Sequence, residues 1–254
     1  MDFFPNLMFQ IHVKKSKKLL PLMIFSFYFL IYLASAGGHP DSFDGVTYFL
    51  MSENLALHGA PTLNIHSPSA QDLGFDVHQY IRIRASLDAW PAWQKHAPDM
   101  RFGDFRDDYL KKVNWESFYA GGYLVLPFLA APLYVIAIIL HIPPTAFVFL
   151  FTNSIIIASS ATVMFMLGKE MFKSERIGFV LSLIFGVTSF IWPYISSFFS
   201  NPLAILFFML SMYFILRQKN ENRNTYSLLA GITLGLSFLS HLESLLLLPP
   251  MLIY

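Results

Sequence analysis

The chain contains no cysteine, few charged residues and almost no excess of either charge. The absence of cysteine excludes a disulfide framework and thiolate chemistry. Charged residues make up only 13% of the 254 residues, and hydrophobic residues make up 55%. The net charge of +1 argues against a nucleic-acid partner. The eight histidines lack the i, i+4 pairing and the Cys/His clusters of a zinc site. Because soluble domains are about a quarter charged, this composition indicates an integral membrane protein.

The N-terminal region has the pattern of a first membrane span with a cytoplasmic start. Residues 1–18 end in four lysines, and the eighteen residues of 19–36 are almost all apolar. A helix of that length extends about 27 Å, close to the roughly 30 Å hydrocarbon core. The lysines favour a cytoplasmic N-terminus. Ala34-Ser-Ala36 also resembles a signal-peptidase site, so a cleaved signal peptide is the alternative.

The distribution of cations along the rest of the chain predicts its topology. Apolar runs follow at 123–142, 145–167, 177–194, 202–216, 226–240 and 244–254. If 123–142 crossed the membrane, the six Lys and Arg of 168–176 and 217–225 would all lie outside. The positive-inside rule therefore favours spans at 19–36, 145–167, 177–194, 202–216 and 226–240, with 244–254 as the start of a truncated sixth. We predict an all-α, polytopic transmembrane helical protein of the cell membrane.

In this topology, residues 37–144 form an external loop domain that is mainly helical. The region holds eleven acidic residues against seven Lys and Arg, and mild acidity suits an external position. The run at 123–142 becomes an interfacial helix at the end of this domain. Trp90, Trp93 and Trp115 are typical of a membrane-interface belt, with stacking on sugars as the alternative.

Asp44 is the first candidate functional residue, because it follows the first span almost directly. Ser42 is suited to N-cap a helix that Gly59 and Pro61 would end. The helix dipole favours the ionised form of a carboxylate in the first turn. Near a membrane surface, such a group is suited to deprotonating an acceptor hydroxyl or to holding a cation beside a lipid phosphate. On spacing alone, an ordinary solvated helix-start aspartate is the simpler interpretation.

Five segments carry short motifs in a characteristic order. They are Asp44, Tyr48, Asn54-Leu55 and Gly59; the aromatic and glycine-rich stretch 118–134; Gly168-Lys-Glu-Met-Phe172; Ser200-Asn-Pro-Leu-Ala204; and 231–249 with Ser240-His-Leu-Glu-Ser244. Together they resemble the membrane glycosyltransferases of the GT-C type, especially the protein O-mannosyltransferase and aminoarabinose-transferase relatives. The resemblance implies that this chain is the N-terminal part of such an enzyme.

The resemblance also implies a reaction and its partners. The donor would be a polyprenyl- or dolichyl-phosphate-linked sugar within the membrane lipid, and the acceptor a protein, glycan or lipid at the outer face. Asp44 would be the catalytic residue, as general base or as the group that orients the acceptor. Substrate contacts are implied for Tyr48, Asn201, His241 and Glu243, although the last two also suit a polar hairpin turn at the interface.

Three departures from the family pattern bear on cofactors. Gly45 stands where an Asp-Glu pair is frequent, Asn201 where metal-using relatives carry aspartate, and His241-Leu242 where relatives have Arg-Pro. No cofactor is therefore certain, and a divalent metal is left open. The resemblance implies a cation or a metal that neutralises the donor phosphate, and in place of the missing arginine the candidates in the outer domain are Arg82, Arg84, Arg101 and Arg106. The last apolar run has only about eleven residues, roughly half of a span, so we expect a fragment.

The alternative function is that of a non-catalytic polytopic membrane protein, such as a transporter, a flippase or an assembly subunit. A transporter prefers ionisable groups in the middle of its spans. The proposed complete spans have almost none, which favours the enzyme.

Overall fold

The computed structural model describes residues 4–37, 43–63, 123–188 and 191–247, and a few isolated positions between 69 and 105. Within this part of the chain the fold is almost entirely helical, which confirms the predicted all-α class. The α-helices are α1 (Phe4–Ser35), α2 (Phe43–His58), α6 (Val125–Ile139), α7 (Pro144–Phe172), α8 (Glu175–Leu183), α9 (Asn201–Glu221) and α10 (Asn224–Ser240). Three short segments are the π-helix η1 (Ile184–Thr188) and the 3₁₀-helices η2 (Trp192–Ile195) and η3 (Leu242–Leu247).

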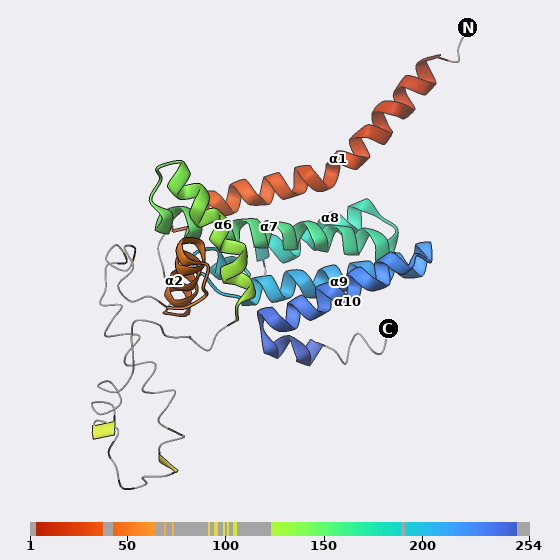
Figure 1. Cartoon of the computed structure of the whole chain (residues 1–254). Coiled ribbons are helices and arrows are strands. Elements are labelled where there is room, and N and C mark those ends of the chain that lie inside the picture. Colours follow the sequence, from red (N-terminus) through yellow and green to blue (C-terminus); the bar gives the residue numbers. More distant parts are fainter. Residues whose placement is uncertain are drawn as a thin grey trace.

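Five of the helices form a bundle, and two lie across one of its ends. Figure 1 shows α1, α7, α8, α9 and α10 running side by side, with α2 and α6 transverse to them. The central helix is α7, which packs against α1, α6, α8 and α9, while α10 packs on α9. The transverse helices pack against each other, and α6 also contacts α7.

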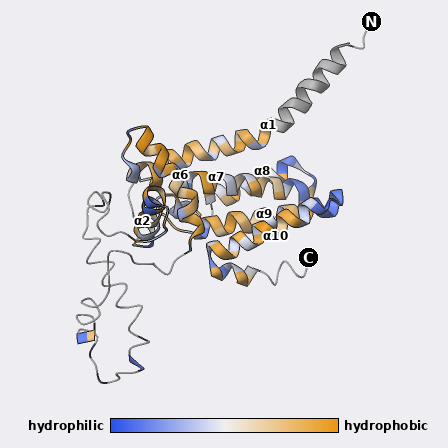
Figure 2. Cartoon of the chain, viewed as in Figure 1, coloured by the Kyte–Doolittle hydropathy of each residue, from blue (hydrophilic) through white to orange (hydrophobic). Residues whose placement is uncertain are grey.

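Apolar length separates the helices into two groups. α7 and α9 are long and apolar enough to cross a membrane, whereas Leu19–Ser35 and Val125–Ile139 are shorter apolar helices. The fifteen residues of α6 extend only about 22 Å, less than the roughly 30 Å hydrocarbon core. Figure 2 shows apolar residues along the bundle and hydrophilic ones at the turns α7–α8 and α9–α10, far from α2 and α6. The multi-pass topology and the orientation of the N-terminus stay predictions.

Several predicted segments have a finer structure or fall outside the described residues. The predicted span at 177–194 comprises most of α8, then η1, then most of η2. Of the predicted external domain, α2, α6, their flanking residues and the isolated positions are described. Trp90, Trp93 and Trp115 lie outside the described residues, as does the end of the chain at 248–254.

Two close approaches at glycines join α7 to α8 and α1 to η1. At Gly168 of α7, an added Cβ would lie 2.9 Å from the Cα of Gly178 in α8, so the two glycines face each other where the helices cross. In η1, the carbonyl of Gly186 accepts a hydrogen bond of 2.8 Å from the Tyr32 hydroxyl of α1. A Cβ on Gly186 would clash with Cε1 of Tyr28. Small residues at such contacts are typical of helices packed in membranes.

Asn153 in α7 fixes the irregular chain that leads from η2 into α9. Its side chain is fully buried, and Nδ2 donates to the carbonyl of Tyr194 at 2.8 Å and also to that of Ser197. Backbone carbonyls outside a helix need partners where water is scarce. Asn153 donates to two of these carbonyls and so ties the chain before α9 to α7.

Ion pairs join the two turns at the hydrophilic end of the bundle. Arg217 of α9 lies 3.1 Å from the Glu170 carboxylate of α7 and also pairs with Glu221. Its guanidinium stands 5.5 Å from the ring centroid of Tyr226 at the start of α10. The α7–α8 turn is therefore tied to the α9–α10 hairpin.

Candidate functional site

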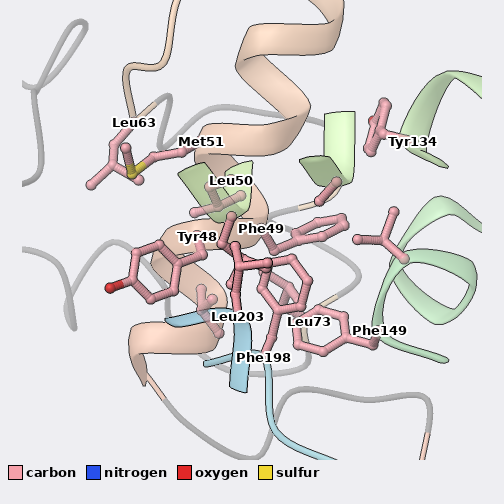
Figure 3. Packing of buried hydrophobic residues seen from close by; sticks show 14 of the residues in the cluster. Tyr48, Phe49, Leu50, Met51, Leu63, Leu73, Tyr134, Phe149, Phe198 and Leu203 are labelled. Carbon is pink, nitrogen blue, oxygen red and sulfur yellow. The ribbon is translucent and has the colours of Figure 1, made fainter. Parts of the chain in front are cut away.

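The candidate site lies at the end of the bundle where α2 and α6 cross. An apolar cluster underlies it: Figure 3 shows Phe49 and Leu50 of α2 packed near Phe149 of α7 and near Phe198 and Leu203, which flank the start of α9. These side chains are between 0% and 3% exposed. The cluster therefore gives α2 and the start of α9 a common, tightly packed base.

Asp44 occupies the position that the sequence predicts, in the first turn of α2. The helix begins at Phe43, next to the predicted N-cap, and ends at His58, where Gly59 has a φ of 71° that suits glycine. The Asp44 side chain is exposed. The carboxylate is therefore accessible at the edge of the site, while the helix that carries it is buried.

Tyr48 links α2 to the start of α9 and to Tyr123. It lies one helical turn after Asp44 and is 8% exposed. Its hydroxyl is 3.5 Å from Oγ of Ser200, which immediately precedes α9. Burial raises the pKa of the phenol, and so does the negative charge of Asp44, whereas hydrogen bonds with Ser200 and with the backbone of Tyr123 lower it. Asp44, Tyr48, Ser200 and Tyr123 are thus one electrostatic neighbourhood.

Asn201 is the first residue of α9 and is partly buried beside this neighbourhood. Ser200 is the N-cap residue, but its side chain accepts no hydrogen bond from the helix. Its hydroxyl is directed at Tyr48 instead. The positive N-terminal end of α9, a helix of 21 residues, therefore lies next to Tyr48 and has no side-chain cap.

His241 and Glu243 follow the last turn of α10. The imidazole of His241 stacks on the Tyr123 ring, with 4.8 Å between centroids, and is 17% exposed. Its Nδ1 lies 3.8 Å from a carboxylate oxygen of Glu243, which is 78% exposed. Tyr123, whose backbone also contacts Tyr48, thus links the α10 end of the site to the α2 end.

The structure therefore brings the five predicted site residues to one end of the bundle. They belong to α2, to the start of α9 and to the chain just after α10, and Tyr123 and Ser200 connect them. Among the described residues, no three His, Cys, Asp or Glu side chains are grouped as they would be around a metal ion. Of the arginines considered for the donor phosphate, Arg101 is exposed, and Arg82, Arg84 and Arg106 lie outside the described residues.

Sequence reasoning missed Glu53, the one buried charged side chain among the described residues, at 1% exposure. Its Oε1 accepts a hydrogen bond of 2.7 Å from the Tyr134 hydroxyl of α6 and one of 3.3 Å from the backbone N–H of Ser69. The only signal in the sequence is a glutamate shortly after the apolar run 49–51 of a short helix. An amphipathic pattern places such a residue on the solvated face, so periodicity alone would not have found it.

A helical bundle in which α7 and α9 are long and apolar enough to cross a membrane, with polar side chains gathered at one end, has the features of a membrane protein. A family model, dolichyl-phosphate-mannose-protein mannosyltransferase, matches residues 127–254, just over half of the chain. The chain belongs to this family of membrane glycosyltransferases. The matched region contains Asn201, His241 and Glu243, and α2 precedes it. No curated protein and no solved structure matches the chain.

Proposed function

We propose that this protein transfers a sugar from a dolichyl- or polyprenyl-phosphate donor to a hydroxyl of a protein, glycan or lipid at the outer face of the membrane. Family membership supports the class of reaction. The single observation that supports this site is the convergence of Asp44, Tyr48, Asn201 and His241 at one end of the bundle. A donor anchored in the bilayer suits an external site, because its tail stays in hydrocarbon while the sugar phosphate reaches the surface.

Asp44 acts as the general base in this proposal. Its exposed carboxylate takes the proton of the acceptor hydroxyl as that oxygen attacks the anomeric carbon. The bond from the anomeric carbon to the phosphate oxygen breaks, and the lipid phosphate leaves with the electron pair. Because the acceptor attacks from the side opposite the phosphate, the anomeric configuration is inverted.

The start of α9 and the end of α10 serve the donor. Backbone N–H groups at the positive end of α9 suit a phosphate, and Asn201 adds a neutral donor there. His241 and Glu243, held by the stack on Tyr123, are suited to hydrogen bonds with sugar hydroxyls. Tyr48 remains a neutral phenol in this arrangement, because its burial opposes ionisation.

A transporter or flippase is the less suitable alternative. Transport of a charged substrate requires ionisable groups inside the bundle. In the described part of α7, α9 and α10, the fully buried polar side chains are hydroxyls and the Asn153 amide. The only buried charge of the described residues, Glu53, lies on α2 at the end of the bundle.

The decisive experiment replaces Asp44 in the complete protein. Membranes containing the Asp44→Asn variant are supplied with radiolabelled dolichyl-phosphate mannose, and label in endogenous acceptors is counted. Loss of a general base lowers the rate by roughly 10²- to 10⁴-fold. Asp99→Asn, which changes an exposed aspartate of the same loop, is the matched control and should transfer normally. Undiminished transfer by Asp44→Asn at equal membrane abundance would refute the proposed base.

A further inference from the structure

The carboxylates of α2 lie on opposite sides of the helix and in opposite environments. Asp44 and Glu53 are nine residues apart, which at about 100° per residue places them roughly 180° apart around the helix axis. Asp44 is exposed, whereas Glu53 is 1% exposed and directed at α6. Any rotation that displaces Glu53 therefore displaces Asp44 in the opposite direction.

Hydrophobic burial alone does not set the rotation of α2. Val46, Phe49 and Met51 point in directions that differ by 60° to 160° on a helical wheel, yet each is 0% exposed. A helix that is apolar on several sides packs comparably after a small turn about its axis, because hydrophobic burial is not directional. Hydrogen bonds are directional, so they select one rotation.

The hydrogen bonds that select the rotation of α2 converge on Glu53. The Tyr134 hydroxyl donates to Oε1 at 2.7 Å, and the same hydroxyl lies 3.4 Å from Oγ of Ser69. The Ser69 backbone N–H donates to Oε1 at 3.3 Å, while Oε2 is buried and has no partner among the described residues. The Tyr134 ring packs against Phe49 at 6.0 Å between centroids. A buried carboxylate is unfavourable unless it is hydrogen-bonded, and other rotations of α2 would lose these bonds.

We propose that Glu53 is a positioning residue: its hydrogen bond with Tyr134 fixes the rotation of α2 on α6 and thereby places Asp44 and Tyr48 against the start of α9. The catalytic part of this inference rests on the proposed function, and the structural part does not. Side chains lie about 5–6 Å from a helix axis, so a rotation of about 20° moves the Asp44 carboxylate by about 2 Å. Displacements of about 1 Å lower rates by up to about 100-fold.

The variants are chosen to separate hydrogen bonding from charge and from packing. Tyr134→Phe removes the hydroxyl and keeps the ring, Glu53→Leu removes the acceptor, and Glu53→Gln keeps an acceptor oxygen without the charge. Tyr28→Phe is the matched control, because Tyr28 is a tyrosine of 1% exposure in α1, away from α2. Transfer from dolichyl-phosphate mannose is measured for each variant in the complete protein. We expect kcat to fall about 10- to 100-fold in Tyr134→Phe and Glu53→Leu, with the donor KM within about twofold.

The position of α2 is measured directly, without reference to activity. Because the chain has no cysteine, spin labels are attached through Leu57→Cys on α2 and Leu228→Cys on α10, two exposed positions. Pulsed dipolar spectroscopy should show a shifted or broadened distance in Tyr134→Phe and Glu53→Leu. The distance should be unchanged in Glu53→Gln and Tyr28→Phe, and their activities should stay within about threefold of the wild type.

Each outcome has a definite meaning. An unchanged distance in Tyr134→Phe overturns the inference, whatever the activity. A changed distance with full activity overturns the positioning role of Glu53. Equal losses in Glu53→Gln and Glu53→Leu also overturn it, because charge and not the hydrogen bond would then matter. If Asp44→Asn stays active, the proposed function fails, while the distances still decide whether Glu53 fixes α2.

Discussion

The crossing of α7 and α8 at Gly178 permits a sharp test of how closely the bundle is packed. In Gly178→Ala, the new Cβ would lie 2.6 Å from the Phe165 carbonyl oxygen and 2.9 Å from the Lys169 backbone nitrogen. Ordinary contacts between carbon and a carbonyl oxygen begin near about 3.3 Å, so the backbones must separate by about 0.7 Å. Neither atom belongs to a side chain that can rotate away.

The expected loss follows from two opposing effects. Overpacking against backbone costs about 3 kcal/mol, the upper part of the usual range. Alanine regains about 1 kcal/mol relative to glycine within a helix. The net destabilisation is therefore about 2 kcal/mol, which for a chain of this size lowers the unfolding midpoint by roughly 4–8 °C.

The matched control is the same substitution where space is free. No atom lies within 4 Å of an ideal Cβ at Gly235 of α10. Gly235→Ala should therefore stabilise the protein by about 0.5–1 kcal/mol. Thermal unfolding of both variants in the same detergent is followed by far-ultraviolet circular dichroism. A Gly178→Ala variant as stable as the wild type, or a similar loss in Gly235→Ala, would refute the close crossing.

Three further predictions, and a control for the last of them, concern single side chains. The folded-state pKa of Tyr48 lies above its ordinary value of 10.0. As pH rises above 10.0, the unfolded chain therefore releases this proton first, and the stability of the folded protein falls. Tyr48→Phe should show a shallower alkaline fall of the unfolding midpoint. Asn153→Ala leaves two backbone carbonyls without their donor and should cost about 1–3 kcal/mol, measured by thermal unfolding. Arg217→Gln, which removes one of the partners of Glu170, should cost about 1 kcal/mol in the same assay. Arg223→Gln, at 72% exposure, should stay within about 0.5 kcal/mol of the wild type.

The sequence predicted α2 more closely than it predicted the surroundings of that helix. Both ends of α2 follow from local signals, because the residue before Phe43 can cap the helix and Gly59 can adopt a positive φ. The side chains of Val46, Phe49 and Leu50 are fully buried, whereas Leu57 near the end of the helix is 44% exposed. The additional burial at Glu53 depends on α6, and a periodic pattern carries no information about such a distant partner.

The region from 177 to 194 shows a second limit of hydropathy. Its composition is that of a span, yet α8 ends at Leu183 and gives way to a π-helix and then to a 3₁₀-helix. The reason lies in partners that are remote in sequence: Tyr28 and Tyr32 crowd Gly186, and Asn153 binds the carbonyls of Tyr194 and Ser197. By contrast, the positions of Asn201 and His241 at helix ends were predictable from the limits of the flanking apolar runs.

The polar residues of α7 have a consequence for how the protein is assembled. Ser154, Ser160 and Thr162 each donate to the carbonyl four residues earlier in the same helix, at 2.6, 2.9 and 2.8 Å. These three hydroxyls are therefore satisfied before any neighbouring helix is present, which would let α7 enter a bilayer alone during synthesis. Asn153 is different, because the carbonyls it binds are translated about forty residues later. Its amide would wait unpaired in the newly inserted helix, and its pairing would mark the arrival of α9 against the helix already in place.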